Sequence, residues 1–441
     1  MYSYADRYLF QANIRHDGSS RFAKKHRWGT FPSFSAGWVL SEENFMKNLN
    51  WEWLSFLKIR ATWGALGNER IGDFPYMSTI AFGNTIFYQN NGIYFDQTAS
   101  QQKYAIENVT WEKTESTDIG LDISFLNNRL RVNGDYYWKN TKDMLLAMAI
   151  PDFLGFSDPD VNAGKMSTKG YELNVSWNDH IGDFSYGIAI NFSDFTSKMG
   201  DLQGTQFLGD KVKMEGSEFN EWYGYVSDGL FLTEEDLKNS PKINDKNTQL
   251  GDIKYKDISG PDGVPDGKIS PEYDRVLLGS SLPHFLYGGN INLGYKNFDL
   301  SLAFQGVGKQ NARLAREMVE PFRNNYGNFP AIIDGNYWSP YNTDEQNAVA
   351  KYPRLTHVNK SSNYAMSDYW LFNGGYFRLK NITLGYTFPK EWMNAIGIKG
   401  ARIYASASDL FCLSKYPKGW DPEMGVSEYP ITTSILLGGS V

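Results

Sequence analysis

The chain has 441 residues and a formal net charge of −7, with Lys and Arg scattered along it, so a nucleic-acid partner is not expected. Aromatic residues make up 16% of the chain and 42 glycines are spread along its length, which favours strands and turns over helices. The longest uninterrupted apolar run, 144–150, is far shorter than the roughly 20 residues that a membrane-spanning helix needs, so no helical span is expected.

A period of two residues recurs along the chain, with one parity apolar and the other small or polar. Strict alternation of this kind predicts β-strands that are buried on one face. About twelve strands are predicted in this way. They cover residues 8–15, 34–40, 57–63, 119–125, 130–138, 171–177, 184–192, 285–295, 298–304, 376–388, 401–410 and 431–441.

The connections between these strands alternate between short and long. Short polar turns at Asn127-Asn128, 178–183 and Lys296-Asn297 predict hairpins. The longest connections, 200–281 and 307–368, are rich in Asn, Asp, Gly, Pro, Trp and Tyr. Bacterial outer-membrane barrels have short turns on one rim and long extracellular loops on the other, and the pattern indicates that architecture.

In one predicted strand, 376–388, the apolar residues switch from odd-numbered to even-numbered positions. Its apolar positions shift near Lys380-Asn381, from Phe377 and Leu379 to Ile382 and the positions that follow. A β-bulge inserts one extra residue and would absorb such a shift. The sequence therefore predicts a bulge at this point.

The alternation alone leaves open a soluble β-sandwich or propeller, in which the apolar parity would fill a dry core. The polar parity is dominated by Asn, Ser, Gly, Thr and Gln, which suits a water-filled lumen. Aromatic residues beside the short turns would form a girdle at one membrane interface. They are Phe125, Trp177, Phe184, Tyr295, Phe298, Phe388 and Trp392. The prediction is an all-β fold, a transmembrane antiparallel β-barrel portion with long extracellular loops.

The same alternation predicts which side chains face lipid and which face the lumen. The residues expected to face lipid are Leu130, Val132, Tyr136, Leu300, Leu302 and Phe304. Those expected to face the lumen are Asn133, Asp135, Ser301 and Gln305.

Several blocks of sequence resemble one family in the same order along the chain. They are 21–38, 103–122, 128–137, 251–257, 376–386 and 419–423. The block 103–113 reads Lys-Tyr-Ala-Ile-Glu-Asn-Val-Thr-Trp-Glu-Lys, and 419–423 reads Gly-Trp-Asp-Pro-Glu. Together they are similar to the SusC/RagA family of TonB-linked outer-membrane proteins.

The resemblance implies a barrel of about 22 strands, of which residues 1–441 would be the C-terminal part, about half. It further implies a location in outer-membrane lipid, import driven by the TonB system, and a SusD-like lipoprotein that closes over the mouth. The substrate would be a glycan oligosaccharide or a peptide. The resemblance also implies that the plug, the TonB-contacting segment and the first barrel strands lie outside residues 1–441. The N-terminus is not the secretory signal that an outer-membrane protein must have, so the sequence is expected to begin inside a longer one. Family members also usually run beyond Val441 to a terminal aromatic residue.

Other function classes are less well supported. No metalloprotease, nucleophile-elbow or phosphate-loop motif is present, so an enzyme is not expected. Cys412 is the single cysteine, no Cys/His spacing resembles a zinc site, and no cofactor is required. A passive porin, an adhesin barrel and a soluble carbohydrate-binding β protein remain alternatives.

The segment 257–274 resembles a calcium loop, because alternating carboxylates around a sharp glycine turn can surround a hard cation with oxygen. Its candidate ligands for a structural calcium are Asp257, Asp262, Asp266, Glu272 and Asp274. The spacing departs from the EF-hand pattern through an insertion at 261–265. An ordinary cluster of Asp-Gly turns explains the same residues.

Aromatic residues in the long connections could stack on sugar rings or hold peptide side chains, because they offer broad apolar faces at low entropic cost. The predicted substrate-binding residues are Trp222, Tyr223, Tyr225, Trp338, Tyr369 and Trp370, with Tyr337 beside them. Packing within the loops is the alternative explanation for each of them.

Overall fold

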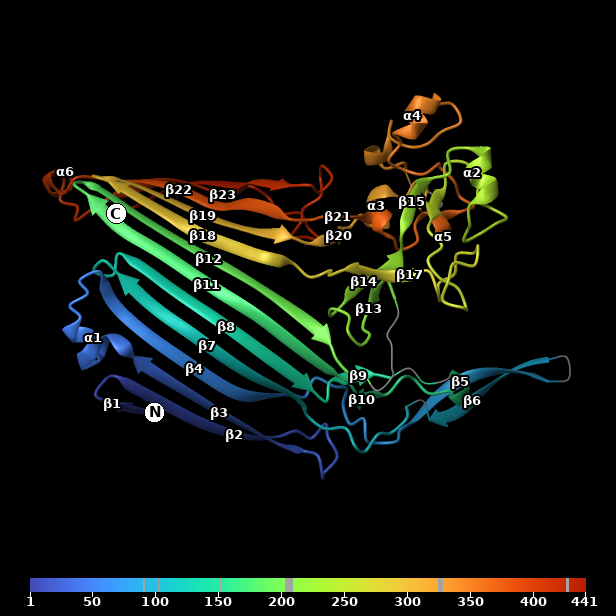
Figure 1. Cartoon of the computed structure of the whole chain (residues 1–441), viewed down its shortest axis with the longest axis horizontal. Coiled ribbons are helices and arrows are strands. Elements are labelled where there is room, and N and C mark those ends of the chain that lie inside the picture. The colour runs from blue at the N-terminus through green and yellow to red at the C-terminus, as the bar shows by residue number, and fades with distance from the viewer. Residues whose placement is uncertain are drawn as a thin grey trace. The chain divides into compact units, whose positions relative to one another are not determined.

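The computed structural model describes residues 1–89, 92–101, 103–148, 150, 152–202, 209–323, 328–425 and 428–441. Its principal element is one large β-sheet, and the helices are short and lie in connections (Figure 1). The chain divides into two compact units, one mainly Met1–Val175 and the other mainly Ser176–Asp194 and Ser217–Val441. Within the described ranges, no helix is long and apolar enough to cross a membrane.

Among the described residues, thirteen strands form the large sheet, and their order in space is their order along the chain. They are β1 (Tyr2–Tyr4), β2 (Tyr8–Gly18), β3 (Trp28–Val39), β4 (Leu54–Asn68), β7 (Glu112–Phe125), β8 (Leu130–Lys142), β11 (Lys165–Ile181), β12 (Phe184–Met199), β18 (His284–Tyr295), β19 (Phe298–Lys309), β22 (Tyr376–Thr387), β23 (Arg402–Ser414) and β24 (Ser434–Ser440). All twelve predicted strands are confirmed. The thirteenth, β1, was missed because three residues are too few to show alternation.

In the first unit, the neighbours from β1 to β8 run antiparallel. The turn between β7 and β8 contains Asn127 and Asn128 with positive φ angles, which Asn tolerates better than most residues. The connection between β3 and β4 carries two short helices, η1 (Leu40–Glu42) and α1 (Asn44–Asn48). The far ends of the strands carry longer connections, with the hairpin β5 (Ile80–Gln89) and β6 (Gly92–Gln101), then β9 (Leu145–Ala147), η2 (Asp152–Leu154) and β10 (Asp160–Asn162) (Figure 1).

In the second unit, the neighbours from β12 to β24 also run antiparallel. Lys296-Asn297 joins β18 to β19 as predicted, and α6 (Lys390–Ala395) lies in the connection between β22 and β23. The turn between β11 and β12 is tighter than the predicted 178–183, because Gly182 adopts a positive φ of 59° and the strands continue to Ile181 and from Phe184.

The opposite ends of these strands carry the two longest connections. The one between β12 and β18 contains β13 (Lys211–Val212), β14 (Glu221–Tyr225), β15 (Ser227–Leu230), α2 (Glu234–Asn239), β16 (Ile253–Tyr255) and β17 (Arg275–Gly279). The one between β19 and β22 contains β20 (Asn311–Arg313), α3 (Arg316–Val319), η3 (Ala331–Ile333), α4 (Asp344–Ala348), α5 (Lys360–Asn363), η4 (Asp368–Trp370) and β21 (Leu371–Asn373).

The strand register places the predicted apolar residues in continuous rows on one face. In the second unit, Leu302 lies opposite Ile291 on β18 and Ile382 on β22. Its neighbour Ser301 lies opposite Asn292 and Thr383 on the other face. Side chains of opposed residues share one face of a sheet, so the predicted division into two faces is confirmed for these strands. The first unit follows the same rule, with Val132 opposite Ile123 and Asn133 opposite Asp122.

The predicted β-bulge is confirmed. The register between β22 and β23 shifts between Leu379 and Asn381, and that between β19 and β22 shifts between Ala303 and Phe304. Lys380 therefore lies outside the regular pairing, and its ammonium reaches Asp409 on β23 at 2.8 Å.

The polar face of the first unit carries an ion-pair network that crosses a glycine. Arg60 on β4 is paired with Gly120 on β7, which is paired with Asp135 on β8. The Arg60 Nη1 lies 2.7 Å from Asp135 Oδ1, and its Nε lies 3.3 Å from Asp122 Oδ1. A Cβ on Gly120 would come within 2.5 Å of the guanidinium carbon. The missing side chain therefore lets an ion pair span three strands.

The second unit repeats this arrangement. Arg402 on β23 reaches Asp299 on β19 across Gly385 on β22, with Nη2 and Oδ2 2.5 Å apart. A Cβ on Gly385 would lie 2.3 Å from the Arg402 Nη2. Both units thus place opposite charges and glycine on the face that carries the predicted lumen residues.

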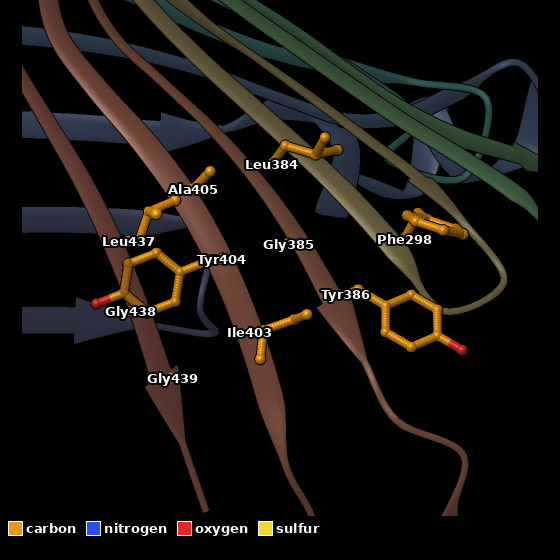
Figure 2. Close-up of a pocket in the computed structure, with 10 residues that line it drawn as sticks. All are labelled: Phe298, Leu384, Gly385, Tyr386, Ile403, Tyr404, Ala405, Leu437, Gly438 and Gly439. Carbon is orange, nitrogen blue, oxygen red and sulfur yellow. The ribbon is translucent and has the colours of Figure 1, made fainter.

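The apolar face of β19, β22, β23 and β24 is hollowed by a shallow groove of about 620 Å³. Figure 2 shows its labelled residues, including the Phe298 and Tyr386 rings, whose centroids are 4.8 Å apart. Leu384 and Leu437 also line it. This lining suits lipid acyl chains, in keeping with the predicted lipid face.

We expect a charge in the middle of this apolar face to destabilise the barrel. An arginine at the bilayer midplane costs about 2–4 kcal/mol, so Leu302→Arg should lower the thermal stability of the full-length protein in lipid. Ser301→Arg is the matched control, because Ser301 is adjacent and points to the polar face. Gln305 is a poorer control, since its amide donates to a charged group, the Glu423 carboxylate, at 3.0 Å, whereas the Ser301 hydroxyl donates to the neutral amide of Asn292. Equal losses for Leu302→Arg and Ser301→Arg would contradict the assignment of the faces.

Candidate functional site: a packed cap of two long connections

The two longest connections fold together around a common apolar core. We call residues 217–281 and 310–373 the cap. Its buried core residues come from both connections and are Tyr225, Leu230, Ile253, Tyr255, Ile269, Met318, Val319, Ile333, Trp338, Tyr364 and Trp370. Segments described from sequence as polar loops therefore have an interior of their own.

A buried carboxylate joins the two halves of the cap. Asp252 has no exposed surface, and its two oxygens accept hydrogen bonds from Arg354 at 2.7 and 3.2 Å. Asn359 and Asn363 also donate to it, at 2.8 and 2.9 Å. The side-chain amide oxygen of Asn363 in turn accepts from the backbone N–H of Ile253 at 2.9 Å. A buried charge is tolerated when it is paired and fully hydrogen-bonded, and Asp252 meets both conditions.

A second buried acid anchors the start of α3. The Glu320 carboxylate lies 2.6 Å from Arg316 and 3.3 Å from Lys360. Burial alone would raise the pKa of Glu320, but the hydrogen bond and charge of Arg316, together with Lys360, outweigh it and lower that pKa. The resulting stabilisation is present above the pKa of the unfolded chain, and it is lost as the pH falls through the lowered value.

The five candidate calcium ligands do not converge. Asp274 is fully buried, and its oxygens accept backbone N–H groups of Ile258 at 2.8 Å and Ser270 at 2.7 Å. Asp257 accepts from the Gly267 N–H at 2.6 Å. The remaining candidates, Asp262, Asp266 and Glu272, are exposed. Across the described ranges, no group of three or more His, Cys, Asp or Glu side chains could hold a metal.

The loop is thus closed by hydrogen bonds from backbone N–H groups to carboxylates, as in a cluster of Asp turns. One oxygen of Asp257 is buried without a hydrogen-bond partner in the described structure. Calcium binding stays a prediction, which a calcium titration of the protein's thermal stability, reversed by chelator, would test.

Three of the six aromatic residues predicted to bind substrate are buried, which corrects the prediction for them. Tyr225, Trp338 and Trp370 are only 8, 9 and 2% exposed. The Trp370 indole N–H donates to the Asn363 carbonyl at 2.9 Å, and the ring of Trp338 packs on Gly251. These three rings have no free face for a ligand. They form the cap core, which is the loop-packing alternative.

The other predicted aromatics keep part of their surface. Trp222 and Tyr223 are half-buried on β14, and cations lie over both rings, Lys211 at 4.7 Å and Arg275 at 4.5 Å from the ring centres. Tyr369 is half-buried and donates its hydroxyl to the Lys351 carbonyl at 2.9 Å. Contact of these three with a substrate stays a prediction, as it does for Tyr337, whose ring packs edge-on against Phe329.

A polar cluster on the sheet was missed by the sequence reasoning. Arg378 on β22 is 3% exposed and donates to both oxygens of Asp421 at 2.6 Å. Glu423 lies within ion-pair distance of both Arg378 and Lys380. Asp421 and Glu423 belong to the Gly-Trp-Asp-Pro-Glu block, so this block fastens the connection between β23 and β24 to the polar face. The family resemblance of the block 419–423 was the only feature of the sequence that pointed to this cluster.

We expect the Asp252 network to hold the cap closed. Asp252→Ala would leave the largely buried Arg354 charge, 15% exposed, without its acidic partner, and loss of one partner of a buried pair typically costs about 3–5 kcal/mol. Hydrogen exchange of the full-length protein should show the cap opening while the barrel strands stay protected. Asp228→Ala is the control, because Asp228 is 49% exposed and forms a surface pair with Lys254 that contributes below about 1 kcal/mol. Similar exchange in the two variants would refute the role of Asp252.

Comparisons with known proteins agree with this architecture. The family described as TonB dependent receptor-like, beta-barrel, matches residues 1–410. The sequence is 32% identical over 459 aligned positions to TonB-dependent receptor SusC of Bacteroides thetaiotaomicron, covering 100% of this chain and 42% of that protein. It is 31% identical over 446 positions to TonB-dependent receptor P3 of Formosa agariphila, covering 96% of this chain and 41% of that protein.

The fold is similar to that in the structure of the RagAB peptide transporter, with a TM-score of 0.78 and 22% identity, over 99% of this chain and 46% of that one. The chain spans about two fifths of the length of the curated relatives it matches. The match over 1–410, the sequence relatives and the thirteen-stranded sheet place the chain in the TonB-dependent receptor β-barrel family, with its SusC/RagA members, as part of an outer-membrane barrel.

Proposed function

We propose that this chain forms the C-terminal barrel part of a transporter that imports bulky nutrients across the outer membrane. Import is driven by the TonB system, which acts through a region outside this chain. The observation that carries the proposal is the packed cap on the long-connection ends of the strands in the second unit. A passive pore needs no such folded structure at its mouth, whereas a selective importer needs a surface that recognises its cargo.

The substrate class is a glycan oligosaccharide or a peptide. The polar face supplies neutral hydrogen-bonding groups, such as the Ser301 hydroxyl bonded to Asn292 at 2.8 Å and the Thr383 hydroxyl 2.8 Å from that of Ser406. Such groups suit hydrated, polar cargo. Among the relatives, RagAB is described as a peptide transporter. The soluble carbohydrate-binding alternative does not agree with membership of an outer-membrane barrel family.

A SusD-like lipoprotein is proposed as the lid, and the β5–β6 hairpin offers it a docking face. Ile86 lies opposite Phe95, and Phe82 lies opposite Ala99, on one face of the hairpin. The Phe82, Ile86 and Phe95 side chains are 83, 61 and 76% exposed. A two-stranded hairpin is only marginally stable in water, so a partner that covers this face would stabilise it.

Membrane lipid is a poor alternative occupant for the hairpin. Segments that lie on a membrane surface usually carry Lys or Arg on their polar face and Trp on the other. Residues 80–101 contain none of these, and Asp96 is their single charged residue. An uncharged apolar surface on a protein partner therefore fits better.

Uptake by intact cells tests the proposed function. Cells that carry the full-length transporter should take up fluorescently labelled oligosaccharides or peptides, and disruption of TonB should abolish that uptake. A passive porin would transport equally well without TonB. Uptake that persists after TonB is disrupted would therefore overturn the proposal in favour of the porin.

Co-purification with the lipoprotein tests the docking face. Phe82→Asp and Phe95→Asp each place a charge on the apolar face, so each should reduce the amount of lipoprotein recovered with the full-length transporter. Ser100→Asp adds the same charge on the opposite face and is the control. Undiminished recovery with both Phe variants, or an equal loss with Ser100→Asp, would remove the hairpin from the interface.

A further inference from the structure

A mixed polar and aromatic cavity lies in the cap, where β20 and α3 follow the end of β19, and Lys211 and Tyr416 line it from outside the cap. Its volume is about 390 Å³, within the range of pockets that hold small ligands. Its side walls carry Lys211, Trp222, Arg313, Arg316, Arg323 and Tyr416. All of these residues belong to the second unit.

The cavity is cationic although the chain as a whole carries a net charge of −7. Among the described residues that line it, four are cationic and Glu317 is the single acidic one. Arg323 pairs with Glu317, and Arg316 pairs with Glu320 from just outside the cavity. Lys211 has no acidic partner within ion-pair distance among the residues that the structure describes, and its ammonium lies over the Trp222 ring.

Arg313 has an unused hydrogen-bond donor. Its side chain is 17% exposed, and its Nη1 lies 2.5 Å from Asp210. Its Nε is buried and has no partner in the described part of the chain. Buried donors without partners are rare in folded proteins because they are costly, so the guanidinium of Arg313 is incompletely paired within the described part of the chain.

Two aromatic rings are held in fixed positions at the cavity. The Trp222 indole N–H donates to the Asn311 carbonyl at 2.5 Å. The Tyr416 ring packs edge-on against Phe372, with centroids 4.9 Å apart. Rings held in this way offer apolar surface without loss of side-chain freedom on binding. The C–H face of a sugar ring can pack against such surface while its charged group pairs with the cations.

We propose that this cavity binds an anionic sugar unit, a pyranose that carries a carboxylate or a sulfate, within an oligosaccharide substrate. This inference rests on the proposed import function and narrows its substrate class. The anionic group pairs with Lys211 and with the arginines, and the ring packs on Trp222. An acidic peptide supplies carboxylates but no pyranose ring, so the aromatic walls favour the sugar.

Calorimetric titration of sugar and peptide probes into the purified complex of the full-length transporter and its lipoprotein tests the inference. The probes are tetragalacturonate, a sulfated carrageenan tetrasaccharide, neutral cellotetraose and a tetra-aspartate peptide. At least one acidic sugar should bind more tightly than cellotetraose, and its affinity should fall at high salt. The carboxylated and sulfated probes distinguish the two anionic groups.

Lys211→Met should weaken binding of the acidic sugar about tenfold, the effect of one charge-assisted contact, and leave cellotetraose unaffected. Trp222→Leu should weaken both sugars. Lys238→Met removes the same charge from the exposed face of α2, outside the cavity, and should change neither.

Several results would overturn the inference. Equal binding of acidic and neutral sugars, or an equal effect of Lys211→Met and Lys238→Met, would remove the anionic specificity. Tighter binding of tetra-aspartate than of either acidic sugar would assign the cavity to peptides. TonB-dependent uptake measured in the same strain keeps the two proposals apart. If uptake depends on TonB while the cavity variants bind the acidic sugar normally, the import function stands and the anionic sugar site does not.

Discussion

The structure depends on one constraint of the hydrocarbon layer, where no water is present to bond an exposed backbone N–H or C=O group. A chain that crosses this layer as strands must satisfy those groups by pairing each strand with its neighbours. Antiparallel pairing in chain order does so with short turns, as at Lys296-Asn297. Because successive side chains point to opposite faces, the same pairing separates an apolar face from a polar one. Sequence alternation, register and faces thus have a single cause.

The polar face must in turn accommodate charge without losing strand pairing. Each unit does this with an arginine and an aspartate that meet across a glycine, Arg60 with Asp135 and Arg402 with Asp299. Arg378 extends this principle to a connection, because it holds Asp421 and Glu423 against the sheet. Ion pairs on the polar face therefore join strands to one another, and they also join β22 to the connection between β23 and β24.

The sequence predicted what is local and missed what is long-range. Strands, hairpin turns and the bulge at Lys380 were predicted because the period of two and its interruption are visible over a few residues. The interior of the cap has no such period, and its central contact joins Asp252 to Arg354, 102 residues apart. For the same reason Tyr225 and Trp370 were predicted as ligand contacts, since an aromatic residue in a long connection looks the same whether it is buried or free.

Labelling of introduced cysteines in intact cells tests whether the cap lies on the extracellular side of the outer membrane and the short turns on the other side. The full-length protein, with Cys412 and any other native cysteine replaced by serine, would carry either Val264→Cys in the cap or Asp183→Cys in the turn between β11 and β12. Both positions are exposed, so accessibility to a membrane-impermeant thiol reagent depends on the side of the membrane. We expect Val264→Cys to react in intact cells and Asp183→Cys to react only after the outer membrane is breached. The reverse pattern, or equal labelling of both in intact cells, would contradict this orientation.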